Sequence, residues 1–266
     1  MYKVADKNQI DKGISVEWLR ENRDNVLIVS DFGYMESYTG KSYENFCSTF
    51  DGLVNFPGQY LKMKDNARLM KLTFREKLVP IKLIDMEMTR DWIESLPHLG
   101  NSRHQEHFKE IARLNGEIAK ETLESIQQTV PAYRATLEMM GQELEQYIDK
   151  NSGGGLVRFT DAHRVKFIDL ALHLAAEYDD HYKTDRYKKR NKCVNGFAFR
   201  FCCAGLMMVI TRSALGVPRD ISDKKLRNDL IDANYLACST YWDGLLTRDD
   251  VLKKVESNLM GLLKAS

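Results

Sequence analysis

Apolar positions near the start of the chain predict a β–α–β unit. Residues 26–29 (VLIV) form a continuous apolar run with β-branched members, which is typical of a strand buried on both faces. Aromatic residues at helical spacing follow over residues 41–56, and a Pro-Gly pair ends that helix. A second short strand is predicted near residues 59–63. This alternation indicates a parallel sheet, to which residues 1–23 are a lead-in with one or two helical turns.

The middle of the chain has a different pattern. Strand signals end after about residue 76, and residues 102–150 read as charged amphipathic helices with apolar stripes. A Gly-rich break follows at residues 151–155. The predicted fold class is therefore α/β with a helical insertion. Its parts are an N-terminal core segment (1–75), the insertion (76–155) and a C-terminal core segment (156–266).

The last third of the chain returns to buried elements. Residues 194–216 are apolar nearly all round and predict a central buried helix, and residues 244–247 (GLLT) predict a short strand. Sites in open parallel sheets form at the carboxyl ends of strands. Asp31 and Asp249 each follow a predicted strand. If these strands are parallel neighbours, both aspartates converge on one edge, and Asp232 leans in from the preceding helix.

Such a group of carboxylates requires a counter-charge. Two carboxylates about 4 Å apart repel each other by up to roughly 4 kcal/mol at an effective dielectric constant near 20. Oxygen ligands of this kind suit Mg²⁺ or Mn²⁺. An ion held in this way can activate water and stabilise charge on a phosphodiester, so the pattern predicts metal-assisted phosphoryl hydrolysis.

Composition adds limits on the surroundings of the protein. The 266 residues are 43% hydrophobic and 29% charged, with a net charge of +1, so the total charge does not indicate a nucleic-acid or membrane partner. No run approaches about 18 consecutive apolar residues, and the first residues lack the apolar core of a signal peptide. Five cysteines without a CxxC pair favour reduced, buried thiols and a cytoplasmic location.

A local basic segment stands out against that neutral total. Residues 183–192 hold six Lys and Arg residues with two tyrosines nearby. One interpretation is a solvated connection between helices, and the other is a patch that contacts a nucleic-acid backbone. The expected substrate-binding residues are Arg186, Lys188, Lys189 and Arg190.

The order of VLIVSDF near the start and NDLIDANYLACSTYWDGLLTRDD near the end resembles that of PIN-like nucleases. The resemblance implies a three-layer α/β/α fold around a parallel sheet and a metal-dependent endonuclease activity, usually on RNA. By position, Asp31 matches the family's first aspartate, Asp232 the aspartate of the late helix, and Asp249 the last one. Thr247 matches the accompanying hydroxyl. Asp250 is expected to cap the helix that follows.

The second acidic position of the family is less well matched. Glu36 is favoured because it is close to the predicted strand end, and Asp65 and Glu76 are the more distant candidates. The asparagine often found two residues after the first aspartate is replaced by Gly33. Asp229 either joins the site from one turn earlier in the helix or caps that helix.

The predicted function is that of a Mg²⁺- or Mn²⁺-dependent endonuclease, most simply a ribonuclease. The three matched aspartates would ligate the metal, and Glu36 would ligate it or position water. The alternatives are a DNA-cleaving nuclease, with single-stranded DNA as substrate, and a PIN-like binding or scaffold module with a degenerate site. A protein partner or inhibitor and a homodimer stay open, and no membrane partner is expected.

Overall fold

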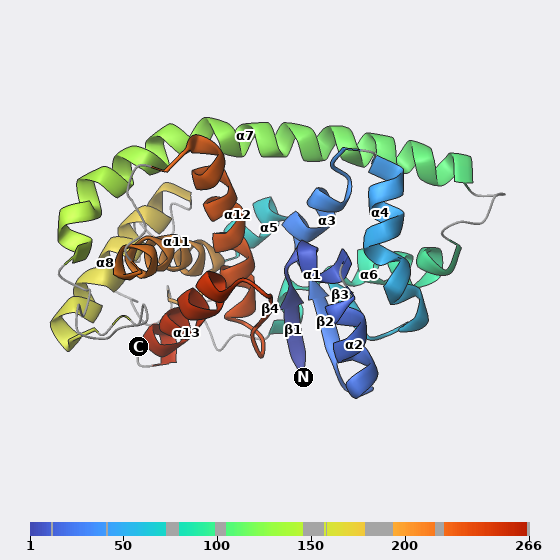
Figure 1. Cartoon of the computed structure of the whole chain (residues 1–266), viewed down its shortest axis with the longest axis horizontal. Coiled ribbons are helices and arrows are strands. Elements are labelled where there is room, and N and C mark those ends of the chain that lie inside the picture. Colours follow the sequence, from blue (N-terminus) through green and yellow to red (C-terminus); the bar gives the residue numbers. More distant parts are fainter. Residues whose placement is uncertain are drawn as a thin grey trace. The chain divides into compact units, whose positions relative to one another are not determined.

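The computed structural model (Figure 1) contains two compact units. The first comprises Met1–Asn66, Pro80–Ser125 and Tyr241–Arg248, and the second comprises Ala67–Val79, Ile126–Thr240 and Asp249–Ser266. The boundaries of these two units differ from those of the predicted helical insertion at 76–155, which stays a prediction. The structure describes residues 1–11, 13–40, 42–72, 80–98, 105–145, 157, 159–178, 194–215 and 221–264.

The first unit contains a four-stranded sheet in the order β3-β2-β1-β4, and every pairing in it is parallel. This arrangement confirms the α/β class and the parallel sheet. The strands expected from residues 26–29, 59–63 and 244–247 are all present, although the last is shorter than predicted. The strands are β1 (Tyr2–Ala5), β2 (Val26–Val29), β3 (Tyr60–Lys62) and β4 (Leu245–Leu246).

β1 was not predicted, and interpreting residues 1–23 as a lead-in was wrong, although the helical turns expected there are present at Ile14–Glu21. In register, β1 lies between β2 and β4, because Val4 is opposite both Ile28 and Leu245. Figure 1 shows β1 flanked by these two strands. β2 and β4 are therefore not neighbours, so the condition under which Asp31 and Asp249 would converge is not met. The apolar run was too short to reveal β1, since only Val4 and Ala5 in it are fully buried.

Helices surround this sheet, and two of them start at side-chain caps. Ser30 Oγ accepts a hydrogen bond from Gly33 N (3.1 Å), and Asp85 Oδ1 accepts one from Met88 N (3.0 Å). The helix predicted over residues 41–56 is found as α4 continued by the 3₁₀ turn η1. The elements are α1 (Lys7–Asp11), α2 (Ile14–Glu21), α3 (Asp31–Ser37), α4 (Ser42–Phe50), η1 (Asp51–Asn55), α5 (Asn66–Met70), which continues into the second unit, η2 (Pro80–Leu83), α6 (Met86–Ser95) and η3 (Leu96–His98).

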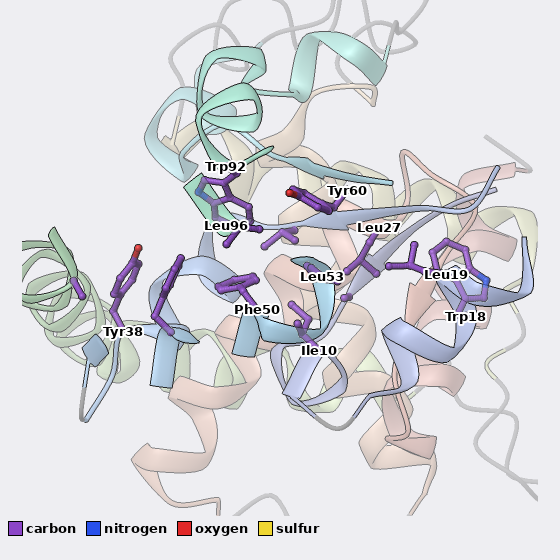
Figure 2. Packing of buried hydrophobic residues seen from close by; sticks show 14 of the residues in the cluster. Ile10, Trp18, Leu19, Leu27, Tyr38, Phe50, Leu53, Tyr60, Trp92 and Leu96 are labelled. Carbon is purple, nitrogen blue, oxygen red and sulfur yellow. The ribbon is translucent and has the colours of Figure 1, made fainter. Parts of the chain in front are cut away.

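An aromatic core joins these helices to the sheet. Trp92 on α6 has ring centroids 4.9 Å from Phe50, 5.2 Å from Tyr34 and 6.4 Å from Tyr60. Figure 2 shows Trp92, Phe50 and Tyr60 within the same group of buried side chains. Because Tyr60 begins β3, this packing fixes the edge of the sheet next to β2.

The second unit is helical, and α11 is its most buried helix. α11 (Phe197–Ala214) packs against α8, α12 and α13, which confirms the predicted buried helix. By length and composition α11 could cross a membrane, but 72% of it is buried inside the protein, as in the core helix of a soluble protein. The 41-residue α7 (Gln105–Glu145) continues through Pro131 and supplies residues to both units. The others are α8 (Asp161–Tyr178), α12 (Asp223–Ser239) and α13 (Asp250–Lys264).

Candidate functional site

The carboxyl ends of the four strands bring polar side chains to one edge of the sheet in the first unit. Asp6 follows β1, Asp31 comes two residues after β2, Lys62 is the last residue of β3, and Thr247 follows β4. Because all four strands are parallel, their carboxyl ends lie at the same edge, where α/β proteins form their sites. Two of these residues, Asp31 and Thr247, were predicted site residues.

Asp31 is buried and already has a positive partner. Its Oδ1 is 3.1 Å from Lys62 Nζ, and its Oδ2 accepts a hydrogen bond from Asn66 N at 3.0 Å. Asp31 is the first residue of α3, where the helix dipole favours a negative charge. Lys62 therefore supplies the counter-charge that the sequence suggested a metal would supply. The role of Asp31 as a metal ligand stays a prediction.

Lys62 is a buried lysine that the sequence analysis missed. Its ammonium also donates to Met63 O (2.9 Å) and lies 4.9 Å from the centroid of the Tyr34 ring. A lysine is seldom this buried without a charged partner. The signal in the sequence was a charged residue at the carboxyl end of a predicted strand.

Asp6 is the second residue that the sequence analysis missed. Its Oδ1 accepts a hydrogen bond from Asn8 N (3.2 Å), and its Oδ2 accepts one from Thr247 Oγ1 (3.3 Å). The motif Asp6-x-Asn8 follows the first strand of the chain. This is the aspartate–asparagine spacing that was sought at Asp31, where Gly33 occupies the second position. The signal was present, but it depended on recognising β1.

Asp249, in the second unit, is the N-cap of α13. It is exposed, and its Oδ1 accepts hydrogen bonds from Val251 N (2.7 Å) and Leu252 N (3.1 Å). The capping role was expected for Asp250, which is instead the first residue of the helix. The cap fixes the Asp249 carboxylate relative to α13.

Asp229 and Asp232 both lie on α12. Asp232 is half-buried, whereas Asp229 is buried and pairs with Arg212 across 2.7 Å. Burial raises the pKa of Asp229 to about 6, the charge of Asp249 adds to this rise, and Arg212 opposes it. Asp229 does not cap the helix, because α12 begins at Asp223 and Ser222 Oγ is its cap. That alternative was wrong, since the helix starts earlier than its apolar residues indicated.

The Asp229→Asn substitution is expected to change the pH dependence of stability. With a pKa raised from 3.8 to about 6, Asp229 holds a proton in the folded protein that the unfolded chain has released at intermediate pH. This stabilisation is fully present below the unfolded pKa and is lost as the pH rises through about 6. Two pKa units correspond to about 3 kcal/mol. Between about pH 4 and pH 7, the free energy of unfolding of the wild type should therefore fall, relative to Asp229→Asn, by an amount of that order.

Urea unfolding of both proteins across this pH range measures the difference. Asp161→Asn, at an exposed carboxylate on α8 of the same unit, is the matched control and should follow the wild type. Parallel pH profiles for wild type and Asp229→Asn would contradict the assignment.

The second unit also holds an apolar pocket of about 340 Å³ between α7, α8, α11 and α12. Tyr133 Oη donates a hydrogen bond to Gly205 O (3.4 Å) at its wall, and burial raises the pKa of this phenol. The tyrosine therefore stays neutral, and the pocket offers apolar surface rather than a base. No sequence pattern indicated this pocket. Its lining residues are Thr129, Ala132, Tyr133, Leu174, Glu177, Tyr178, Phe201, Cys202, Gly205, Leu206 and Leu230.

The remaining predicted residues lie partly inside and partly outside the described part of the chain. Glu36 on α3 and Asp65 after β3 are both half-buried residues of the first unit, and either fits the second acidic position by sequence. Glu76 lies outside the described residues, as do the expected substrate-binding residues Arg186, Lys188, Lys189 and Arg190. The cysteines in the described part of the chain, Cys47, Cys202, Cys203 and Cys238, form no disulfide with one another. Cys202, Cys203 and Cys238 are buried as expected, and Cys47 is half-buried.

The fit of this edge to a divalent cation is partial. Among the residues that the structure describes, no group of three or more His, Cys, Asp and Glu side chains is placed to hold a metal ion. Asp6 and Thr247 offer oxygen donors of the type that Mg²⁺ and Mn²⁺ prefer, whereas Asp31 already pairs with Lys62. Comparisons of the chain with protein-family models, with curated proteins and with solved structures gave no match.

Proposed function

We propose that this protein is a metal-dependent nuclease with a three-layer PIN-like core and that RNA is its substrate. The observation that carries the proposal is the hydrogen bond between Thr247 and Asp6, which are 241 positions apart. It joins the Asp-x-Asn motif after the first strand to the Thr-x-Asp motif after β4. Both motifs belong to the family pattern, and their strands are direct neighbours in the sheet.

The order of acidic residues along the chain supports the same proposal. With Asp6 as the first aspartate, Asp31 and Glu36 fall on the helix that follows the second strand, where the family carries its second acidic residue. Asp232 and Asp249 keep the late positions already matched. The proposed resemblance therefore takes in the first strand as well, and it does not include the middle helices.

Asp6 is the metal-holding residue that the contacts in the first unit favour. Its carboxylate is buried, and Asn8 N and Thr247 Oγ1 hold it in one orientation. Asp232 and Asp249 enter the proposal through their order in the chain alone. A bound Mg²⁺ or Mn²⁺ would supply an activated water and neutralise charge on the phosphodiester. Glu36 is proposed to orient that water, and the basic segment 183–192 is proposed to contact the RNA backbone.

A PIN-like binding or scaffold module is the second candidate. The observation that favours it is the pairing of Asp31 with Lys62, because this removes one carboxylate from the expected metal ligands. Such a module would bind nucleic acid or a protein without cleaving RNA.

The deciding experiment incubates the protein with mixed RNA and single-stranded DNA in the presence of Mn²⁺ or EDTA. We expect RNA to be cleaved with Mn²⁺ only. Asp6→Asn and Asp249→Asn should each reduce the rate by about 100-fold or more, since loss of a metal ligand costs at least as much as loss of its supporting partner. Asp91→Asn, at an exposed position on α6, is the matched control and should cleave like the wild type.

The other possible results of this experiment either contradict the proposal or support one of the alternatives. Cleavage in EDTA, or full activity of Asp6→Asn, would contradict the proposal. RNA binding without cleavage would support the scaffold module, and cleavage of single-stranded DNA alone would support the DNA nuclease. Mn²⁺ should also raise the melting temperature of the wild type by mass action, without any substrate.

A further inference from the structure

We infer that the Lys62 ammonium takes the place of a cation at Asp31, so that Asp31 is a positioning residue and the metal ion binds without it. This inference rests on the proposed nuclease function and departs from the prediction that Asp31 is a metal ligand. By this inference, Lys62 limits the number of metal ions that bind at this edge of the sheet.

The first step is that the ammonium has no unused hydrogen. Lysine has three N–H donors, and here they face Asp31 Oδ1 (3.1 Å), Met63 O (2.9 Å) and the Tyr34 ring (4.9 Å to its centroid). The side chains of Lys62 and Asp31 are 4% and 7% exposed. Lys62 therefore cannot contact a substrate, and it acts only through the groups that it holds.

The second step is that the charge of the Asp31 carboxylate is already balanced by the Lys62 ammonium. Its other oxygen, Oδ2, accepts the hydrogen bond from Asn66 N at the start of α5. A metal ion that binds Asp31 would have to displace the ammonium or lie directly beside it. In either case a buried ammonium would be close to a second cation, which is strongly unfavourable.

The third step is the position of the pair relative to Asp6. Ala5 of β1 is opposite Val29 of β2, and Val29 is opposite Lys62 of β3. Asp6 and Asp31 therefore follow adjacent strands, which are about 4.8 Å apart in a sheet. Without Lys62, the Asp31 carboxylate would be a buried negative charge without its counter-charge, and it would attract a cation of its own. With Lys62, the charge of Asp31 is balanced.

The test measures Mn²⁺ binding without nucleic acid, by the electron paramagnetic resonance of free Mn²⁺ and by thermal unfolding. Asp6→Asn should weaken Mn²⁺ binding by about 10-fold or more, whereas Asp31→Asn should leave the affinity unchanged. Lys62→Met should bind one additional Mn²⁺ ion and gain more in melting temperature from Mn²⁺ than the wild type. The double variant Lys62→Met/Asp31→Asn should lose this gain and bind Mn²⁺ like the wild type.

A purely structural ion pair would give no additional Mn²⁺ ion in Lys62→Met, and that result would overturn the inference. A folded Asp31→Asn protein that has lost Mn²⁺ binding as completely as Asp6→Asn would overturn it as well. If Asp31→Asn does not fold, the Mn²⁺ affinity of the double variant is compared with that of the wild type instead. The double variant also lacks the Asp31 carboxylate, and it contains no unpaired buried charge.

The failure of the proposed function is distinguishable from the failure of this inference. The additional Mn²⁺ ion that Lys62→Met is expected to bind depends on Asp31 and not on Asp6 or on RNA cleavage. A wild type that neither binds Mn²⁺ nor cleaves RNA, together with a Lys62→Met variant that binds Mn²⁺ through Asp31, would overturn the nuclease and retain the role of Lys62.

Discussion

The Trp92→Ala variant is expected to lose about 4 kcal/mol of the free energy of unfolding, in the range found for large-to-small changes at buried aromatic residues. Trp92 is 4% exposed, and its ring contacts the rings of Phe50, Tyr34 and Tyr60. Removing the indole leaves a cavity that three rigid rings cannot close without leaving their rotamers. Edge-to-face packing against Phe50, at an interplanar angle of 60°, is lost as well.

The substitution should also loosen the candidate site. The Tyr34 ring packs against Trp92 and also contacts the Lys62 ammonium, so its position depends on the cavity. Urea unfolding followed by circular dichroism measures the loss of stability. Ile81→Ala, at a residue that is 50% exposed in the same unit, should change the stability by less than about 0.5 kcal/mol. A loss of under 1 kcal/mol for Trp92→Ala, on the order of a surface change, would contradict the packing described for this core.

The Lys62→Met variant is expected to lose about 3–5 kcal/mol of the free energy of unfolding in EDTA. Methionine fills much of the space of lysine but leaves the Asp31 carboxylate buried without a counter-charge. Adding Asp31→Asn should restore most of that loss, because replacing both partners of a buried ion pair by neutral groups is often close to neutral. The difference from additivity measures the coupling of the two side chains.

The matched control for this cycle is an exposed ion pair. Lys120 and Glu124 lie 3.9 Å apart on α7 and are 77% and 63% exposed. Lys120→Met should change the stability by less than about 1 kcal/mol, since solvent screens such pairs. If Lys62→Met proved as mild as Lys120→Met, the Lys62 ammonium would not be the counter-charge of Asp31.

Elements with a strong local pattern could be predicted from the sequence. β2 is a continuous apolar run, and α11 is apolar all round, so both were found from hydrophobicity alone. β1 could not be found in this way, because its four residues include the exposed Tyr2 and only two fully buried positions. Its identity as a strand depends on pairing with β2 and β4, which are far from it in sequence.

The candidate site follows the same division. Asp31 was predicted because it follows a recognisable strand, and Thr247 because it matches a position of the PIN-like pattern, whereas Asp6 was missed together with β1. The partner of Asp31 was also missed, since the contact with Lys62 joins residues 31 positions apart and depends on the register of β2 and β3. The Asp249 cap was assigned to its neighbour Asp250 because a helix start cannot be fixed to one residue from its pattern.

The pairing of β1 with β4 has a consequence for synthesis on the ribosome. β1, β2 and β3 all emerge within the first 62 residues, but β4 is made more than 180 residues later. Until then β1 is an edge strand with unpaired backbone groups on one side. Exposed edges of this kind favour pairing with other chains and aggregation, which chaperones counteract. The Thr247–Asp6 contact forms only after residue 247 has been translated. The proposed ribonuclease would therefore stay incomplete while it is surrounded by the RNA of the ribosome that makes it.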